Sequence, residues 1–232
     1  MAGFIFPPHP STNMKIRPDS AGMLEEEGGW LSQRKYNGWH SVVHLHKAEG
    51  VCNIWHRSGE PFTKYQMTPE MRDCFLQGVQ VDPEVEVVLN GELIHGQAVS
   101  DVTGQQALRH TVVLFDLLYL GRPLLTEGFE ERYNLLASIC GSPVKLEPKK
   151  RGLAVAEVGE SKLWLAEVFR NEFLYRFYEF FEFDEQGRDK FPEIEGLVCK
   201  RATGSALKLG NVPYDVNWMV RVRKTKEKIY LF

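Results

Sequence analysis

The sequence predicts an α+β fold in which antiparallel sheets are flanked by helices. Segments that alternate in polarity and are rich in β-branched residues outnumber segments with helical periodicity. Strands and helices do not alternate regularly, as a parallel sheet with crossover helices would require. With 232 residues, 43% hydrophobic and 25% charged, the chain can form one sizeable core or two small ones.

The N-terminal part of the chain contains one predicted hairpin and one predicted helix. About the first 30 residues are rich in proline, glycine and charge, so we expect an irregular lead-in. Residues 41–46 and 51–56 alternate in polarity on either side of a turn, which predicts two paired strands. Residues 69–78 begin with Pro, end with Gly and have apolar residues at helical spacing, which predicts a short amphipathic helix.

The remaining elements follow from the same patterns. We expect helices at 126–139 and 161–180, a loop at 143–151, and strands at 85–89, 92–95, 111–120, 196–200 and 218–223. The 161–180 helix would place a row of aromatic residues on one face, and burial in a core is the expected role of that face. A glycine-rich loop separates the last two strands.

Charge is unevenly distributed along the chain. The formal net charge is −3, but residues 197–232 contain eight basic and two acidic residues, which is +6 locally and leaves −9 elsewhere. A localised basic surface on an acidic body suits a polyanion bound at one place. A solvated basic C-terminus is the plainer alternative.

The spacing of the cysteines and the length of the apolar segments indicate the cellular compartment of the protein. The four cysteines are far apart without metal-ligand spacing, so we expect free thiols in a reducing compartment. No stretch approaches the roughly 18 apolar residues of a membrane span, and no secretory leader is recognisable. We therefore expect a soluble cytoplasmic protein with no membrane partner.

The segment with the strongest chemical content is RKYNGWH, residues 34–40. Taken alone, Lys35 before Asn-Gly would be an exposed charge in a turn. A nucleophilic lysine must be held near an electrophile and lose a proton, although its reference pKa is about 10.4. Neighbouring cations and partial burial achieve this. Arg34 and the distal basic segment are candidate cations.

Six segments in order resemble the motifs of ATP-dependent polynucleotide ligases, which belong to the covalent nucleotidyltransferase superfamily with RNA ligases and mRNA capping enzymes. The family motifs are KxDG, SRxGE, LDGEL, FDLLYL, EGLVLK and WxKxK. The matching segments here are 35–38 (KYNG), 56–60 (HRSGE), 89–93 (LNGEL), 115–120 (FDLLYL), 195–200 (EGLVCK) and 218–223 (WMVRVR). The resemblance covers about residues 30–224 and implies a ligase-type adenylation domain.

The resemblance implies a role for each matching residue. Lys35 would be the catalytic nucleophile, attacking the α-phosphate of ATP to form lysyl-AMP. The ATP-binding residues would be Gln33, Arg34, Arg57, Glu92, Phe115, Lys200, Arg221 and Arg223. Glu195 and Glu92 would hold Mg²⁺ or Mn²⁺, and His40, Arg201 and Lys224 would contact nucleic acid. Read singly, Phe115 would be a core residue and both glutamates would be turn charges; only the joint pattern favours the functional reading.

Four of the departures from the family pattern bear most on the expected site. Asn37 and Asn90 stand where Asp is usual, which removes two negative charges near the expected phosphate site. Gln33 replaces a Glu, and its amide can still recognise the adenine amino group. His40 stands where DNA ligases carry an Arg associated with nucleic-acid phosphate, and a partly neutral His would bind that phosphate more weakly.

The choice among nucleotidyltransferases depends on further segments. Residues 121–125 (GRPLL) and 131–136 (ERYNLL), together with His44, are similar to DNA ligases. We therefore favour sealing of nicks in duplex DNA, with RNA joining as the alternative. A capping guanylyltransferase and a non-catalytic nucleic-acid-binding module are less favoured.

DNA ligases and capping enzymes usually continue into an OB-fold domain, and this chain has only eight residues after Lys224. We expect a single adenylation domain over residues 1–232, acting as a monomer or with a helper protein, and the compactness suggests a virus-encoded enzyme. A truncated chain is the alternative. Candidate substitutes for the missing phosphate contacts are Lys15, Arg17 and residues 149–151 (KKR), although solvated charge is their plainer reading.

Overall fold

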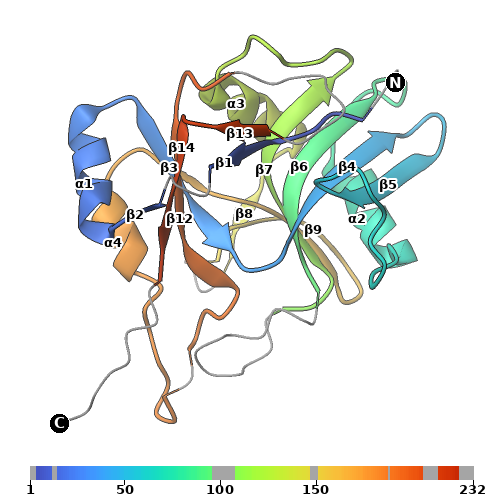
Figure 1. Ribbon diagram of the computed structural model, residues 1–232. Coiled ribbons are helices and arrows are strands. Elements are labelled where there is room, and N and C mark those ends of the chain that lie inside the picture. The colour runs from blue at the N-terminus through green and yellow to red at the C-terminus, as the bar shows by residue number, and fades with distance from the viewer. Residues whose placement is uncertain are drawn as a thin grey trace.

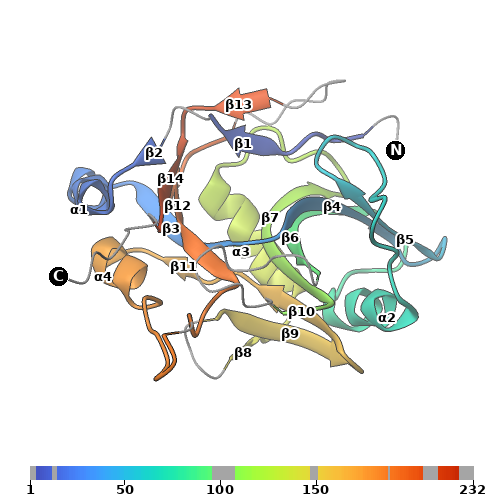
Figure 2. The same ribbon diagram turned by 60° about the horizontal axis from the view of Figure 1, so that its bottom comes forward.

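The computed structural model describes residues 4–11, 15–95, 108–146, 151–187, 189–205 and 214–224. The strands form two main sheets that face each other, with a two-stranded ribbon across one end of the space between them (Figures 1 and 2). Most strand pairs are antiparallel, and the helices are few and short. The predicted α+β fold class is confirmed.

The larger sheet has seven strands in the order β5-β4-β6-β7-β10-β9-β8. Their bounds are β4 (Trp39–His46), β5 (Val51–His56), β6 (Val87–Ile94), β7 (Thr111–Leu120), β8 (Val144–Lys145), β9 (Leu153–Val158) and β10 (Ser161–Leu165). β4 and β5 form the predicted hairpin. β10 pairs parallel with β7, whereas the other neighbours in this sheet are antiparallel.

The smaller sheet has five strands in the order β11-β3-β12-β14-β2. Their bounds are β2 (Lys15–Ile16), β3 (Trp30–Tyr36), β11 (Val168–Phe169), β12 (Ile194–Arg201) and β14 (Met219–Arg223). The chain passes from this sheet to the larger one at Asn37–Gly38, between β3 and β4. The separate ribbon pairs β1 (Pro8–Pro10) with β13 (Tyr214–Val216) in parallel.

The described residues include four helices that cover the sheets: α1 (Pro18–Glu27), α2 (Pro69–Gly78), α3 (Phe129–Ile139) and α4 (Phe173–Tyr178). α2 begins as predicted, with a Thr68 side chain that accepts a hydrogen bond from Met71 N and a proline in the first turn. It packs on β9 and β10, α3 packs on β7, and α1 packs on α4. None of these helices in the described part of the chain is long and apolar enough to cross a membrane.

Four local predictions are wrong, the first being the loop expected at 143–151, which contains β8. The lead-in contains β1, β2 and α1, and the expected 161–180 helix is instead β10, β11 and a one-and-a-half-turn α4. Ser161–Leu165 pairs with β7 on one side and β9 on the other. Glu172, the residue before α4, has a positive φ of 60°, so α4 does not continue a helix from the preceding residues. Tertiary pairing has overridden local periodicity here. The two strands expected at 85–89 and 92–95 are one strand, β6. Asn90 and Gly91, which were expected to separate them, pair with both β4 and β7.

Apolar side chains form two principal cores. One lies under the seven-stranded sheet and α2, and includes Val43, Phe75 and Leu89. The other lies against the five-stranded sheet and α4, and includes Phe177 and Leu197. All four cysteines are free, as predicted.

Candidate active site

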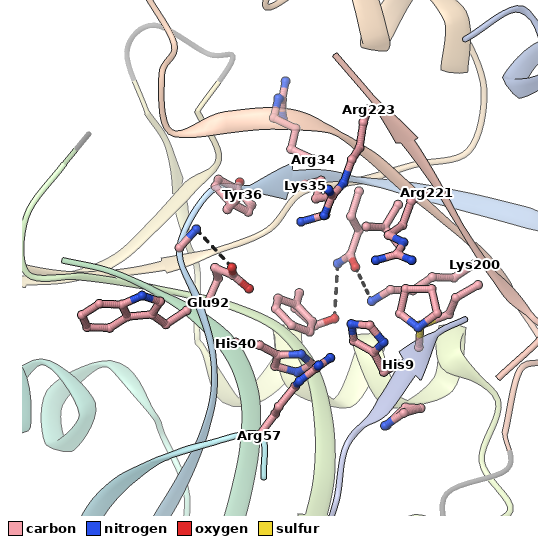
Figure 3. A pocket seen from close by; sticks show the side chains of 18 of the residues that line it. His9, Arg34, Lys35, Tyr36, His40, Arg57, Glu92, Lys200, Arg221 and Arg223 are labelled. Carbon is pink, nitrogen blue, oxygen red and sulfur yellow. Dashed lines mark hydrogen bonds between the residues drawn. The ribbon is translucent and has the colours of Figure 1, made fainter. Parts of the chain in front are cut away.

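A cavity of about 430 Å³ lies between the two sheets, within the size range of small-molecule sites (Figure 3). Strands of both sheets contribute to its walls: β3, β12 and β14 on one side, and β4, β6 and β7 on the other. The loop after β5 and the short strand β1 complete the lining. The six motif segments are scattered over 190 residues of sequence, and the two facing sheets bring at least one residue of each to this space or directly beside it.

Lys35 lies at the end of β3, and its ammonium group forms an ion pair with the Glu195 carboxylate of the neighbouring strand β12. Alternation along β3 directs Gln33 and Lys35 to the cavity face. The Arg34 guanidinium points to the opposite face, where it pairs with Glu167 at 3.4 Å and Glu179 at 3.3 Å and stacks over a phenylalanine ring. Arg34 is among the residues that line the cavity, but its guanidinium is paired with the two glutamates, so its contact with ATP stays a prediction that this geometry does not favour.

A β-bulge brings Glu195 to Lys35. The register between β12 and β3 shifts between Ile194, which pairs with Tyr36, and Gly196, which pairs with Lys35, so that Glu195 is the extra residue. Gly196 has φ of 152°, and a Cβ there would lie 1.9 Å from Val222 O, so no other residue fits. Bulges re-aim side chains, and here the carboxylate turns toward the lysine.

Glu92 is a second carboxylate at this end of the cavity. Its side chain accepts a hydrogen bond from Gly38 N at 3.1 Å, and a Cβ on Gly38 would meet Leu93 O at 2.5 Å, which explains the glycine that follows Asn37. Burial raises the pKa of Glu92 to about 7, Lys35 opposes this shift and Glu195 reinforces it. Glu92, Glu195 and Lys35 thus form one electrostatic unit. Among the described residues, no group of three or more His, Cys, Asp and Glu side chains is arranged to hold a metal ion.

The opposite end of the cavity is built from Phe115, Gln33 and Lys200. The Gln33 amide donates to Phe115 O at 3.3 Å and accepts from Lys200 Nζ at 2.7 Å, so its orientation is set by the protein. Lys200 Nζ also lies over the Phe115 ring, 4.9 Å from its centroid. An aromatic face beside fixed polar atoms suits a flat heteroaromatic ring.

Burial lowers the pKa of Lys200 to about 7, although Asp116 partly offsets the shift. Between about pH 7 and 10 the unfolded chain therefore binds a proton at this residue that the folded chain lacks. Folding stability should rise with pH in this window by up to about 1.4 kcal/mol per pH unit from this group alone. Urea unfolding of wild type and Lys200→Met at pH 6.5, 8 and 9.5 measures this, and parallel pH dependences of the two proteins would contradict it.

Cationic side chains line the remaining walls. Arg221 and Arg223 alternate along β14 toward the cavity, and Arg57 follows β5. Arg223 lies 3.6 Å from Glu195, and Arg221 donates to Ser11 O at 2.9 Å. The cavity therefore has carboxylates at one end and a surplus of positive charge around them.

Two of the departures from the family motifs contact each other. His40 Nε2 lies 2.7 Å from Asn90 Oδ1 across β4 and β6. Burial lowers the pKa of His40 to about 3, so the ring is neutral at physiological pH. A neutral pair thus occupies the positions where the family carries Arg and Asp, and His40 faces the cavity rather than the protein surface.

Two residues predicted to contact nucleic acid, Arg201 and Lys224, are paired within the protein, and their contact with nucleic acid stays a prediction. Arg201 stacks over the Trp30 ring and pairs with Glu27 of α1. Lys224 pairs with Asp189 at 3.0 Å and is largely buried. Neither lines the cavity. Both lie on β12 or just after β14, but their side chains are directed away from the space between the sheets.

Several lining residues were not expected from the sequence: Pro8, His9, Pro10, Trp39, His56, Val198 and Met219. Val198 and Met219 follow from strand alternation once Lys200 and Arg221 are placed. Nothing in the sequence PPHP indicated that residues 8–10 reach this site, since the contact depends on long-range pairing with β13.

Solved structures of DNA ligases share the fold of this chain. The chain is similar to mycobacterial DNA ligase D complexed with ATP and MES, with a TM-score of 0.59, 17% identity, and coverage of 94% of this chain and 60% of that one. It is also similar to the ligase domain of M. tuberculosis LigD, with a TM-score of 0.52, 19% identity, and coverage of 84% and 53%. The chain thus spans little more than half the length of these structures, and the likeness shows a shared fold.

No curated protein sequence matches the chain. Residues 15–173 match the family described as ATP dependent DNA ligase domain, which includes the segments of Lys35, Arg57, Glu92 and Phe115. This match covers more than half of the chain, which therefore belongs to the ATP-dependent DNA ligase domain family and has the fold of a ligase nucleotidyltransferase domain.

Proposed function

We propose that this chain is the catalytic domain of an ATP-dependent polynucleotide ligase in which Lys35 becomes adenylated. The observation that carries the proposal is the position of Lys35 Nζ, paired with Glu195 at one end of a cavity whose other end is the aromatic and amide site of Phe115 and Gln33. A nucleophile at one end of the cavity and a site for the nucleobase at the other match the phosphate and the adenine of ATP.

In this proposal adenine stacks on Phe115, and the Gln33 carbonyl accepts from its amino group. The α-phosphate lies beside Lys35, with Arg57, Arg221 and Arg223 around the phosphates. Nζ loses one proton to the Glu195 carboxylate, the acceptor in contact, and attacks the α-phosphorus, so that the N–P bond forms as the bond to pyrophosphate breaks. The second proton that Nζ must lose to become a phosphoramidate leaves with the departing pyrophosphate. AMP then passes from Lys35 to a 5′-phosphate end, and a 3′-hydroxyl displaces AMP to seal the break.

The two glutamates fit a divalent cation. Mg²⁺ is usually bound by one or two carboxylates together with substrate phosphates, rather than by a complete cage of protein ligands. Glu195 contributes to the raised pKa of Glu92, and a cation held by the two glutamates would favour the ionised form of Glu92. Bound there, Mg²⁺ or Mn²⁺ would supply charge neutralisation for the phosphates.

We favour nicked duplex DNA as the substrate. The family to which the chain belongs is described as a DNA ligase domain, and the similar structures are DNA ligases by name. RNA joining is the alternative because the neutral His40–Asn90 pair changes the cavity wall at a position that related enzymes associate with nucleic-acid phosphate.

Labelled nucleotide tests the first step. The protein is incubated with α-labelled ATP or GTP and Mg²⁺ or Mn²⁺, and the adduct is mapped by peptide mass spectrometry. We expect a label from ATP at Lys35. A label from GTP alone would favour a capping guanylyltransferase, and the absence of label with both nucleotides and both metals would favour a non-catalytic module.

The substrate is tested by sealing assays on nicked DNA, nicked RNA, hybrid duplexes and single strands, at low salt because phosphate-dominated binding weakens steeply with ionic strength. We expect nicked duplex DNA to be sealed fastest. Faster sealing of an RNA strand would replace DNA by RNA in the proposal. Adenylation without sealing of any substrate would point to a required partner.

A further inference from the structure

The N-terminal segment Phe4–Ser11, here called the strap, crosses the space between the two sheets. Its strand β1 pairs with β13, and the ribbon that they form crosses one end of the space between the sheets, as Figures 1 and 2 show together. Pro8, His9 and Pro10 all line the cavity. The strap lies outside residues 15–173, the part of the chain that matches the ligase family. It also precedes the first of the six motif segments, which begins at Lys35.

The strap is held at both ends. On the side of the larger sheet, Phe4 packs edge-on against Trp55 of β5 and lies over Gly59, while Ile5 and Phe6 are buried. On the side of the smaller sheet, Arg221 of β14 donates to Ser11 O. Anchors on both sheets, with a paired strand between them, fix the backbone of His9 relative to the cavity.

The ring of His9 has a defined environment. Nδ1 lies 3.5 Å from Asp215 Oδ1, the residue that pairs with His9 in the ribbon. The ring is stacked with the His40 ring at a centroid distance of 6.1 Å. Burial, with Arg57 and Arg221 nearby, lowers the pKa of His9 to about 4 despite Asp215, so the ring is neutral at physiological pH.

The Asp215 carboxylate selects one tautomer of this neutral ring. A carboxylate only accepts, so the proton of the imidazole resides on Nδ1 and Nε2 keeps its lone pair. Asp215 does not line the cavity and His9 does, which leaves Nε2 as the nitrogen available to a bound molecule (Figure 3). The strap thus presents a hydrogen-bond acceptor in a cavity otherwise rich in cationic donors.

We propose that His9 is a nucleotide-binding residue that accepts a hydrogen bond at Nε2 from a ribose hydroxyl of ATP. This inference rests on the proposed function. Phosphate oxygens lack the proton that Nε2 requires, and Arg57 and Arg221 already supply donors for them. The ribose carries two hydroxyl donors, and it joins the base at Phe115 to the phosphates at Lys35. His40, whose ring lies 5.6 Å from the Phe115 ring, stacks with His9 beside this intermediate position.

The test compares ATP with 2′-deoxy-ATP and 3′-deoxy-ATP as donors in the adenylation reaction. Wild type should discriminate against one of the two analogues by about tenfold in kcat/KM, the scale of one net hydrogen bond. In His9→Ala and His9→Phe this discrimination should disappear, with ATP weakened to the level of that analogue. His9→Phe keeps a packed ring in the strap, so it separates loss of the acceptor from loss of packing.

His46→Ala is the matched control, because His46 lies at the far end of β4 and pairs with Glu49. It should retain the wild-type discrimination. Equal use of all three nucleotides by wild type, or unchanged discrimination in both His9 variants, would overturn the inference. If wild type forms no adduct, the proposed function has failed separately, and equilibrium binding of the three nucleotides to wild type and His9→Phe then decides the role of His9.

Discussion

Lys35→Arg should form less than about one thousandth of the wild-type adduct with ATP. A guanidinium keeps its proton at any pH at which the protein is folded, so it has no lone pair with which to attack the α-phosphorus. The substitution preserves the positive charge and the partner Glu195, so we expect the fold and ATP binding to be retained. Losses of this size are typical when a nucleophile is removed.

The measurement is the labelled adduct, accompanied by ATP binding and a thermal unfolding curve for each protein. Lys64→Arg is the control, since Lys64 is exposed and does not line the cavity. It should label like wild type. Adduct formation by Lys35→Arg at more than a few per cent of the wild-type rate would mean that a different side chain carries the nucleotide.

Arg132→Met should lower the free energy of unfolding by about 3–5 kcal/mol, the range for breaking a buried ion pair. Arg132 and Asp116 are both fully buried, and Arg132 Nε and Nη2 each donate to the Asp116 carboxylate at 2.9 Å. Arg132 also donates to Glu127 O and Gly204 O. Its loss leaves Asp116 as an uncompensated buried charge.

Urea unfolding at pH 7 measures the effect. Arg122→Met is the matched control, because Arg122 pairs with Glu127 while its side chain is 65% exposed, and exposed pairs contribute less than about 1 kcal/mol. The double variant Asp116→Leu/Arg132→Met should recover part of the loss. Equal destabilisation by Arg122→Met and Arg132→Met would show that burial does not decide the cost.

This ion pair gives the charged residues of two family-like segments a structural role. Asp116 follows Phe115 in FDLLYL, and Arg132 belongs to ERYNLL. The pair ties α3 to β7 and so holds the strand that carries Phe115. Motif reading placed both segments correctly in the family, but the sequence held no sign that their charged residues meet in the interior.

The motif residues around the cavity were predicted from the resemblance of six segments to the ligase motifs, since pattern alone would have made Phe115 a core residue and both glutamates turn charges. Gln33, Lys35, Glu92, Phe115 and Lys200 meet once the strands pair. Arg34 has a different environment, since adjacent residues of a strand face opposite ways and its guanidinium pairs with Glu167 and Glu179. Closeness to Lys35 in the sequence is therefore a poor guide to which side chains share its face of the strand.

The position of His9 and the structure of residues 161–180 were not predictable, because both depend on strand pairing between distant segments. Aromatic residues at 173, 177 and 180 do pack into a core, as expected, but only six of the twenty residues form a helix. His9 reaches the cavity because β1 pairs with a strand more than 200 residues away. In both cases the deciding interactions are long-range, and hydrophobic periodicity reports only local ones.

The bulge at Glu195 has a consequence for how such sites are found. Val198 and Lys200 share the cavity face of β12, and strict alternation would put Glu195 on the other face, five positions before Lys200. Two residues an odd number of positions apart on one strand can therefore face the same cavity only if a bulge inserts one extra residue between them. Here a glycine in a positive-φ position directly after the acidic residue marks that addition. A search template that enforces even spacing would miss Glu195, the ion-pair partner of Lys35.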